Sequence, residues 1–189
     1  MSSVFSVENL SIEGLKVITP FLAEDERGYF LKDFEENIYK RYGLENSLSE
    51  SFFTKSREGV IRGLHFQINR PQIKVVSVLQ GEVLDVAVDL RYNSETFGKW
   101  EAIVLSEVNH KSLYIPAGFA HGFQVLSDDA LVSYKCIGNY DGETDSGIRY
   151  NDEELNIVWN KEHEAVVSKR DMSLMTLAEF KNTYGGLRV

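Results

Sequence analysis

The sequence predicts a mainly β protein that folds as a single domain, either a sandwich or a small barrel. Residues 59–160 contain short runs rich in Val, Ile, Leu and Tyr, with turn residues between them. The runs recur at a spacing of roughly 8–12 residues, which favours an all-β architecture over βαβ units. The length of 189 residues suits one domain, and the 43% hydrophobic content is enough for a sizeable core.

The part of the chain before residue 59 is mixed. The segments FSVENL (5–10) and GLKVITP (14–20) read as short strands. Asp33 and Glu36 have the spacing of a capping box, which predicts a short helix over 34–42 that Gly43 ends.

Within residues 59–160, the run GVIRGLHFQ (59–67) comes first. It is followed by KVVSVLQ (74–80), EVLDVAVDLR (82–91), EAIVLS (101–106), SLYIP (112–116), GFQVL (122–126) and LVSYKC (131–136). The intervening turns are Gly81, YNSETFG (92–98), EVNHK (107–111) and LSDDA (126–130). Near the end, Thr176 and Glu179 form a second capping-box candidate, for a helix over 176–184.

Composition and charge exclude several classes of protein. A net charge of -9 and a pI near 5.0 argue against nonspecific binding to nucleic acid or to an anionic membrane. No run approaches the roughly 20 apolar residues of a membrane span, and the start of the sequence lacks a signal-peptide pattern. The single cysteine, Cys136, forms no intrachain disulfide, which fits a reducing compartment. We therefore expect a cytoplasmic protein with no membrane or nucleic-acid partner.

Several polar side chains share a strand face with small or apolar neighbours. Strict alternation groups His65 with Ile61, Gly63 and Gln67; Lys74 with Val76 and Val78; Asp85 with Val83, Ala87 and Asp89; and Tyr134 with Val132 and Cys136. If these faces line a barrel interior, the polar groups converge in a cavity.

Each of these residues, taken alone, also has a purely structural interpretation. His65 would be a core histidine bonded to a carbonyl, Lys74 would extend to solvent, and Tyr134 would be a packing tyrosine. Asp85 would pair with a neighbouring cation, and Asp171 would be a solvated loop residue.

Two motifs favour a functional interpretation of these residues over a structural one. IPAGFAHGF (115–123) places His121 at a strand-to-strand turn, and together with RGLHFQ (62–67) it resembles the two motifs of the cupin superfamily. Metal-dependent cupins have His-x-His in the first motif, whereas here Gln67 stands at the second position and Lys74 follows. Because glutamine is a weak transition-metal ligand and an ammonium competes with a cation, we expect no metal and no other cofactor.

A more specific resemblance, covering nearly the whole chain, is to the dTDP-4-dehydrorhamnose 3,5-epimerase family of metal-free cupins. It rests on EDERGYF, GVIRGLHFQ, KVVSVLQGEVLDVAVDLR, SETFGKW, LYIPAGFAHGF, LVSYKC, NDEELNIVW and SKRD, in that order. The resemblance implies one domain over 1–189, a double-stranded β-helix (jelly-roll) barrel with a few short peripheral helices. Residues 1–58 would supply N-terminal strands and a helix, 59–160 the barrel core, and 161–189 a C-terminal extension.

The family's substrate is a nucleotide-linked 4-keto-6-deoxyhexose, and the resemblance assigns the roles of four residues. Removing a proton from C3 or C5 leaves an enolate, so the site needs a base, an oxyanion stabiliser and an acid on the opposite face. By resemblance, His65 is the base and Asp171 accepts a hydrogen bond from its other ring nitrogen. Lys74 would hold the charge on the C4 oxygen, and Tyr134 would return a proton from the far face.

The resemblance also assigns the substrate-binding residues. Arg27 and Arg62 match positions that bind the diphosphate. His121, Asp85 and Tyr140 would form walls of the sugar pocket, and Phe30, Glu50, Phe52, Gln67, Asp145 and Arg170 complete the set. Strict alternation places Arg62 opposite His65, so both line one site only if Gly63 kinks the strand or the two serve different parts of the cleft.

The departures from the family pattern cluster on the nucleotide side. Lys32 stands where a glutamate is common, and Glu50, Ser51 and Phe52 replace a common Gln-Asp-Asn segment. Asp145 for Glu and Arg170 for Lys are milder changes. Because an ionised Glu50 only accepts hydrogen bonds, the base could be the cytosine or guanine of CDP or GDP rather than thymine. Alternatively, Phe52 could stack on a base of any kind.

Four alternatives to a double epimerase remain open. They are a C3-only or C5-only epimerase, a ketoisomerase, a non-catalytic sugar-nucleotide-binding cupin and a metal-dependent oxygenase. The resemblance also implies a homodimer whose N-terminal strand pairs onto the partner, and a role in making bacterial cell-envelope polysaccharide.

Overall fold

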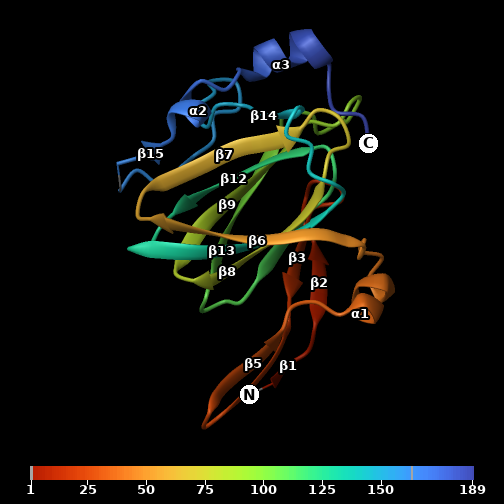
Figure 1. Ribbon diagram of the computed structural model, residues 1–189, viewed down its shortest axis with the longest axis vertical. Coiled ribbons are helices and arrows are strands. Elements are labelled where there is room, and N and C mark those ends of the chain that lie inside the picture. Colours follow the sequence, from red (N-terminus) through yellow and green to blue (C-terminus); the bar gives the residue numbers. More distant parts are fainter. Residues whose placement is uncertain (1, 163) are drawn as a thin grey trace.

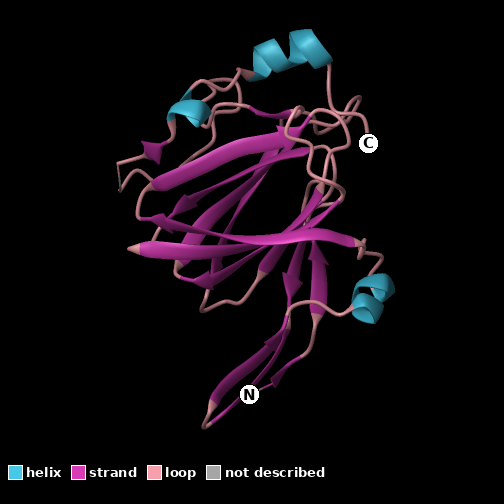
Figure 2. Ribbon diagram, in the orientation of Figure 1, coloured by secondary structure: helices cyan, strands magenta, loops and turns pink. Residues whose placement is uncertain are grey.

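Two six-stranded sheets face each other and enclose the core of the protein. The computed structural model describes residues 2–162 and 164–189, and Figures 1 and 2 show the sheets as two stacked layers. The first sheet has the order β10 (Trp100–Ser106), β9 (Glu82–Asp89), β12 (Phe119–Val125), β7 (Val60–Gln67) and β14 (Asp145–Gly147). A short strand, β15 (Val166–Val167), pairs with β7 in parallel. The mainly β barrel predicted from the sequence is confirmed.

The second sheet is built partly from strands near the N-terminus. Its order is β2 (Ser6–Asn9), β3 (Lys16–Thr19), β11 (Ser112–Ile115), β8 (Ile73–Gln80), β13 (Asp129–Ile137) and β6 (Leu48–Arg57). Strands β2, β3 and β6 therefore extend the barrel outside the segment 59–160 that was expected to form its core. A third sheet, β1 (Ser2–Ser3), β4 (Phe21–Asp25) and β5 (Gly28–Lys32), projects away from the barrel (Figure 1).

The alternation of β9 separates two apolar clusters, as the sequence predicted. Val83 and Ala87 point between the sheets, where they pack with Phe123 and Tyr134. Val86, Val88 and Leu90 point to the outer face of the first sheet. Helix α3 (Leu177–Tyr184) covers that face, and the Phe180 ring meets the Phe66 ring edge-on at 5.1 Å. Packing therefore fixes which side chains of β9 face the barrel interior.

The two capping-box predictions have different outcomes. Thr176 and Glu179 form the complete box at α3, and Gly185 ends that helix with φ of 69°. The prediction for Asp33 is wrong. The predicted helix itself forms as α1 (Glu36–Arg41), but its N-cap residue is Glu35, which makes no side-chain capping bond. The Asp33 carboxylate is paired with Lys135 of β13 instead of capping the helix.

Strand β7 contains a bulge at Gly63 that determines which side chains face the interior. Arg62 lies opposite Phe123 of β12 and His65 lies opposite His121, so two residues of β7 face the single residue Gly122. Because Phe123 and His121 are two apart and share a face, Arg62 and His65 also share that face. The kink at Gly63, one of the two solutions expected from the sequence, is confirmed.

Replacing Gly63 by alanine is expected to destabilise the protein strongly. A Cβ atom at Gly63 would lie 2.6 Å from the Gly122 Cα atom, and φ is +121°. Gly28, at φ +117°, is the matched control, because a Cβ atom there meets nothing within 4 Å. Gly28→Ala should cost about 1–3 kcal/mol from backbone strain alone. Gly63→Ala should cost about 2 kcal/mol more from overpacking, which urea denaturation would measure. Equal losses for the two variants would contradict a steric role of Gly63.

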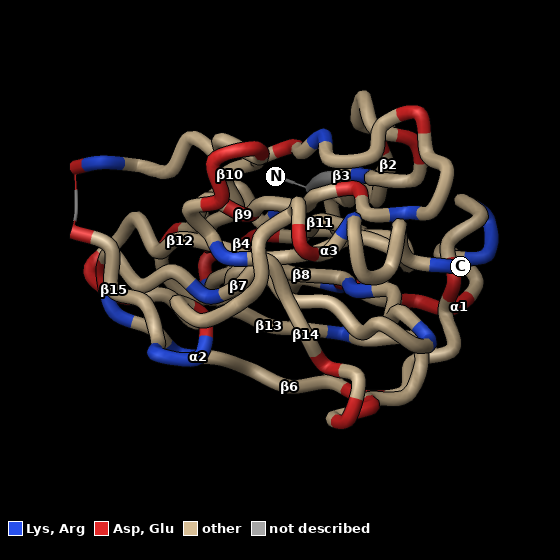
Figure 3. The backbone as a smooth tube through the Cα atoms, turned by 90° about the horizontal axis from the view of Figure 1, so that it is seen from above, with Lys and Arg blue, Asp and Glu red and all other residues tan. Residues whose placement is uncertain are grey.

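The helices of this fold are short. In the described residues, none is long and apolar enough to cross a membrane. Acidic and basic residues are interspersed around the outside of the chain (Figure 3), and α2 (Lys169–Met172) carries two neighbouring basic residues, Lys169 and Arg170.

Candidate active site

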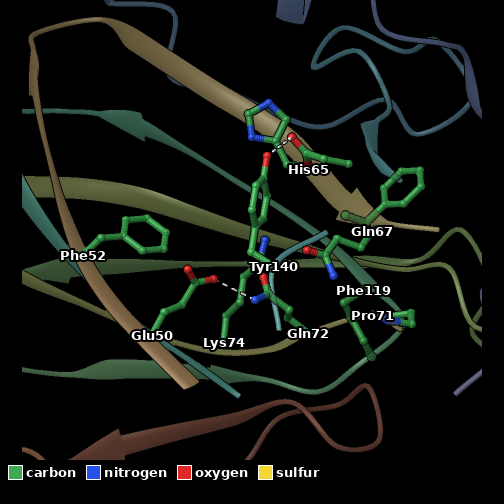
Figure 4. Close-up of a pocket in the computed structure, with 11 residues that line it drawn as sticks. Glu50, Phe52, His65, Gln67, Pro71, Gln72, Lys74, Phe119 and Tyr140 are labelled. Atoms are coloured by element: carbon green, nitrogen blue, oxygen red, sulfur yellow. Dashed lines mark hydrogen bonds between the residues drawn. The ribbon is translucent and has the colours of Figure 1, made fainter. Parts of the chain in front are cut away.

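A cavity of about 320 Å³ opens between the two sheets (Figure 4). Its lining comes from β6, β7, β8, β12 and β14, together with the loop between β7 and β8 and the loop before β14. The lining residues are Glu50, Phe52, His65, Phe66, Gln67, Pro71, Gln72, Lys74, Phe119, Tyr140 and Asp145. The cavity therefore brings together many of the polar residues that the sequence singled out.

His65 and Asp171 are in direct contact, as the sequence indicated. The His65 Nε2 atom lies 2.9 Å from Asp171 Oδ1, and Asp171 Oδ2 accepts a hydrogen bond of 3.1 Å from the Gly63 backbone N–H. Helix α2 carries Asp171, and its N-cap residue Ser168 accepts a 3.0 Å bond from the Asp171 N–H. Asp171 is thus a buried residue in a capped turn, and the solvated-loop interpretation of it is wrong.

The hydrogen bonds around Asp171 determine its charge and, through it, the tautomer of a neutral His65 ring. Burial acts to raise the pKa of Asp171, but hydrogen bonds from His65, Gly63 and Ser168 bring it below the ordinary value. An ionised carboxylate only accepts hydrogen bonds, so the proton of a neutral His65 ring resides on Nε2. The Nδ1 atom is then an unprotonated base, on a ring that lines the cavity.

Asp171→Asn is expected to show a pH-dependent loss of stability. Because the folded-state pKa of Asp171 is lowered, its ionised form stabilises the fold above the ordinary pKa of 3.8, and this contribution is lost as pH falls through the folded value. The variant should be less stable by about 1.5–3 kcal/mol near neutral pH, the usual contribution of hydrogen bonds to a charged group. Urea denaturation at about pH 7 and about pH 3.5 would measure both values. A difference that does not shrink at low pH would contradict the ionised dyad.

Lys74 lies on the opposite wall from His65, in the second sheet. Lys74 of β8, Cys136 of β13 and Glu50 of β6 are directly opposite one another in the sheet register, so all three point to one face. Burial lowers the pKa of Lys74, and Cys136, Asp145, Asp85 and Glu50 act against that effect. The ammonium makes no hydrogen bond or ion pair within residues 2–162 and 164–189, so it is available to a ligand oxygen.

Tyr134 also belongs to the second sheet and is held between two rings. It stacks on Phe52 at 4.7 Å with an interplanar angle of 12°, and His121 meets it edge-on at 5.8 Å. The His121 Nε2 atom lies 2.9 Å from each Asp85 oxygen, so His121 itself is fixed. His121 lies within β12 and not at a turn as the sequence indicated, because the turn is completed at Gly118.

The environment of Tyr134 keeps its hydroxyl protonated. Burial, followed by the charge of Asp85, raises the pKa of Tyr134 well above its ordinary value, and Arg62 opposes this. Asp85 thus pairs with His121, a neighbouring residue that is able to carry a positive charge. A tyrosine that is neutral at physiological pH has a hydroxyl that can donate a proton, and Tyr134 lies in the sheet that faces the sheet of His65.

Three residues form a polar group at the edge of the cavity. The Arg170 Nη2 atom donates a 2.6 Å hydrogen bond to Asp145 Oδ2, and the Tyr140 hydroxyl donates to the same oxygen at 3.4 Å. Figure 4 shows Tyr140 extending into the cavity. This group links α2, which carries Asp171, to β14, the strand that pairs with β7 beside His65.

Gln67 and Glu50 are engaged with neighbouring protein groups. The Gln67 amide donates to the Arg70 and Asn139 carbonyls and accepts from the Asp141 N–H. It therefore braces the loop that carries Tyr140. Glu50 accepts a 2.8 Å hydrogen bond from Gln72, and Figure 4 shows this pair below the His65 side of the cavity.

The two arginines predicted to bind the diphosphate, Arg62 and Arg27, lie in different parts of the structure. Arg62 donates from Nε to the Ser56 hydroxyl at 2.9 Å, on the cavity-facing side of β7. Arg27 lies in the turn of the β4–β5 hairpin, where it pairs with Asp25, and Phe30 is 59% exposed on β5. The predicted site residues that are not among those lining this cavity are Arg27, Phe30, Arg62, Asp85, His121, Tyr134, Arg170 and Asp171.

Sequence reasoning missed four of the lining residues, Phe66, Pro71, Gln72 and Phe119. Pro71 and Gln72 directly precede the strand of Lys74, which is the only signal that could have found them.

The part of the chain that the structure describes contains no group of three or more His, Cys, Asp or Glu arranged to hold a metal ion.

The cavity thus brings His65 from one sheet and Lys74 from the other together, in a barrel of jelly-roll type. These features define the class of cupin-fold epimerases. Residues 9–179 match the family model described as dTDP-4-dehydrorhamnose 3,5-epimerase, and the chain belongs to that family.

Known relatives resemble the chain over nearly its whole length. It is 44% identical over 171 residues to the dTDP-4-dehydrorhamnose 3,5-epimerase of Methanothermobacter thermautotrophicus, covering 89% of this chain and 92% of that protein. The Legionella pneumophila epimerase, solved in complex with dTDP-4-keto-L-rhamnose, has a TM-score of 0.93 and 39% identity, with coverage of 98% and 99%. ChmJ from Streptomyces bikiniensis, a 3'-monoepimerase, has a TM-score of 0.87 and 31% identity, with coverage of 95% and 91%.

Proposed function

We propose that this protein inverts C3 and C5 of a nucleotide-linked 4-keto-6-deoxyhexose, converting dTDP-4-dehydro-6-deoxy-D-glucose to dTDP-4-dehydro-L-rhamnose. The observation that carries the proposal is the His65–Asp171 dyad beside the first sheet, with Tyr134 in the facing sheet, where it stacks on the cavity residue Phe52. A base and an acid on opposite walls are what inversion at carbon requires, because the proton must leave one face and arrive at the other.

In the first step, His65 Nδ1 takes the proton from the carbon next to the ketone. The C–H electron pair becomes a C=C bond, and the C4 oxygen becomes an enolate oxygen. The ionised Asp171 stabilises the imidazolium that forms. Lys74, which has no competing partner in the described chain, stabilises the enolate oxygen.

In the second step, the Tyr134 hydroxyl gives its proton to the carbon from the opposite face. The electron pair of the C=C bond forms the new C–H bond, the ketone returns, and a tyrosinate remains. The nearby Arg62 charge, which acts to lower the pKa of Tyr134, stabilises that tyrosinate. Solvent then reprotonates Tyr134 and removes the proton from His65, so the pair is ready for the second carbon.

Substrate binding uses the edge of the cavity and a second copy of the chain. Arg62 pairs with the diphosphate, and Tyr140, Asp145 and Arg170 border the sugar. Arg27 and Phe30 lie on a projecting hairpin, which supports a homodimer in which each hairpin reaches the partner's cavity. The product feeds the synthesis of cell-envelope polysaccharide in the cytoplasm.

Proton NMR in D2O with dTDP-4-dehydro-6-deoxy-D-glucose tests the proposal. Deuterium entering at both C3 and C5, with formation of the inverted product, is the expected result. Exchange only with a CDP or GDP analogue would assign a different nucleotide, in line with the acceptor-only carboxylate of Glu50 in the cavity. No exchange with any of the three substrates would overturn the proposed function.

A single-centre epimerase is the second candidate. The similarity to ChmJ, a 3'-monoepimerase, favours considering it, because a chain of the same fold is assigned to inversion at one carbon. Deuterium at C3 alone, in the same NMR experiment, would select this alternative.

A further inference from the structure

Phe52 and Tyr134 face each other across two neighbouring strands. Tyr134 of β13 is directly opposite Phe52 of β6 in the sheet register, so the two side chains leave the sheet on the same face. Their rings are nearly parallel, with centroids 4.7 Å apart and an angle of 12°. Phe52 is 40% exposed whereas Tyr134 is 7% exposed, so Phe52 covers Tyr134 at the cavity wall.

The Tyr134 ring is confined by packing alone. His121 holds the ring by an edge-on contact at 5.8 Å, and both Asp85 oxygens fix His121 in turn. The Tyr134 hydroxyl makes no hydrogen bond to any side chain or backbone group that the structure describes. A buried tyrosine usually has such a bond, so the direction of this O–H depends on the two rings that enclose it.

We propose that Phe52 is a positioning residue that holds Tyr134 at the reacting carbon and thereby commits the enolate to inversion. This inference rests on the proposed function, in which Tyr134 is the acid. The enolate has two fates: His65 returns a proton to the original face, or Tyr134 supplies one to the other face. Among the described residues, Phe52 makes a ring contact with Tyr134 and none with His65, so its loss should change the partition between these fates.

The partition can be measured because the two fates leave different products in D2O. Return of a deuteron from His65 gives exchanged substrate with its configuration retained, whereas donation from Tyr134 gives exchanged, inverted product. A misplacement of about 1 Å is enough to lower a proton-transfer rate about 100-fold. In Phe52→Ala, we therefore expect the ratio of exchanged substrate to inverted product to rise by about 10-fold or more.

The neighbouring residue provides a matched control. Phe53 is an aromatic residue on the same strand, opposite Ser133, and it points to the other face with 60% exposure. Phe53→Ala removes the same ring atoms without touching Tyr134 and should keep the wild-type ratio. Phe52→Tyr retains a stacking ring and should also keep that ratio, which separates ring contact from any loss of stability.

Three results would overturn the inference. One is that exchange and inversion fall by the same factor in Phe52→Ala. The others are a Phe53→Ala variant that shifts the ratio equally, and a Phe52→Tyr variant that fails to keep it. These results differ from failure of the proposed function, in which wild-type protein exchanges no deuterium with any of the three nucleotide sugars.

Discussion

His65→Ala should lose deuterium exchange at both carbons, with kcat lowered by about 10²–10⁴-fold, the usual contribution of a positioned general base. The physical reason is that the His65 ring lines the cavity and is oriented by the 2.9 Å contact between Nε2 and Asp171, which leaves Nδ1 of the neutral ring free to accept a proton. NMR in D2O measures exchange and turnover in the same sample. Because removal of the ring leaves space in the cavity, added imidazole should restore part of the exchange.

Two outcomes bear on this prediction. Binding of the nucleotide sugar by His65→Ala, measured by calorimetry, should stay within about 10-fold of the wild type, because proton abstraction and not binding is lost. Wild-type exchange rates in His65→Ala would show that another group removes the proton.

Tyr134→Phe should separate exchange from inversion. The substitution keeps the ring between Phe52 and His121 but removes the hydroxyl that donates the proton. Inversion should fall by about 100-fold or more, while deuterium exchange into unconverted substrate stays within about 10-fold of the wild type, because His65 still removes and returns protons. Chiral analysis of the recovered sugar together with NMR gives both rates.

The Tyr134→Phe result would also calibrate the proposed action of Phe52. Both variants should move the partition in the same direction, and Tyr134→Phe should move it further because it removes the donor entirely. If Tyr134→Phe inverts the sugar at the wild-type rate, water or another side chain is the acid, and the enclosure of Tyr134 by two rings has no catalytic consequence.

Local sequence patterns predicted the parts of this fold that depend on neighbouring residues. The alternation of β9 and the box formed by Thr176 and Glu179 are both decided within a few residues of the chain. The helix start at Asp33 was wrong because a distant residue, Lys135, binds that carboxylate. Pairing across 102 positions is invisible to a local pattern.

The same distinction between local sequence patterns and contacts of distant residues applies to the site. Periodicity put His65, Lys74 and Tyr134 on apolar faces, but it could not show that His65 and Lys74 line one cavity while Tyr134 packs against the lining residue Phe52. The bulge at Gly63 shifts Arg62 by one position relative to strict alternation, and only pairing with β12 reveals it. The stack of Phe52 on Tyr134 depends on the register between β6 and β13, and β6 itself was not predicted from the sequence.

The wide separation of His65 and Asp171 along the chain has a consequence for biosynthesis. The two residues are 106 positions apart, which corresponds to roughly 5–20 s of translation at ordinary rates. The strands that line the cavity all precede Ile148, so they emerge from the ribosome before the carboxylate does. The contact between His65 and Asp171 is therefore completed only after all the strands that line the cavity have been synthesised.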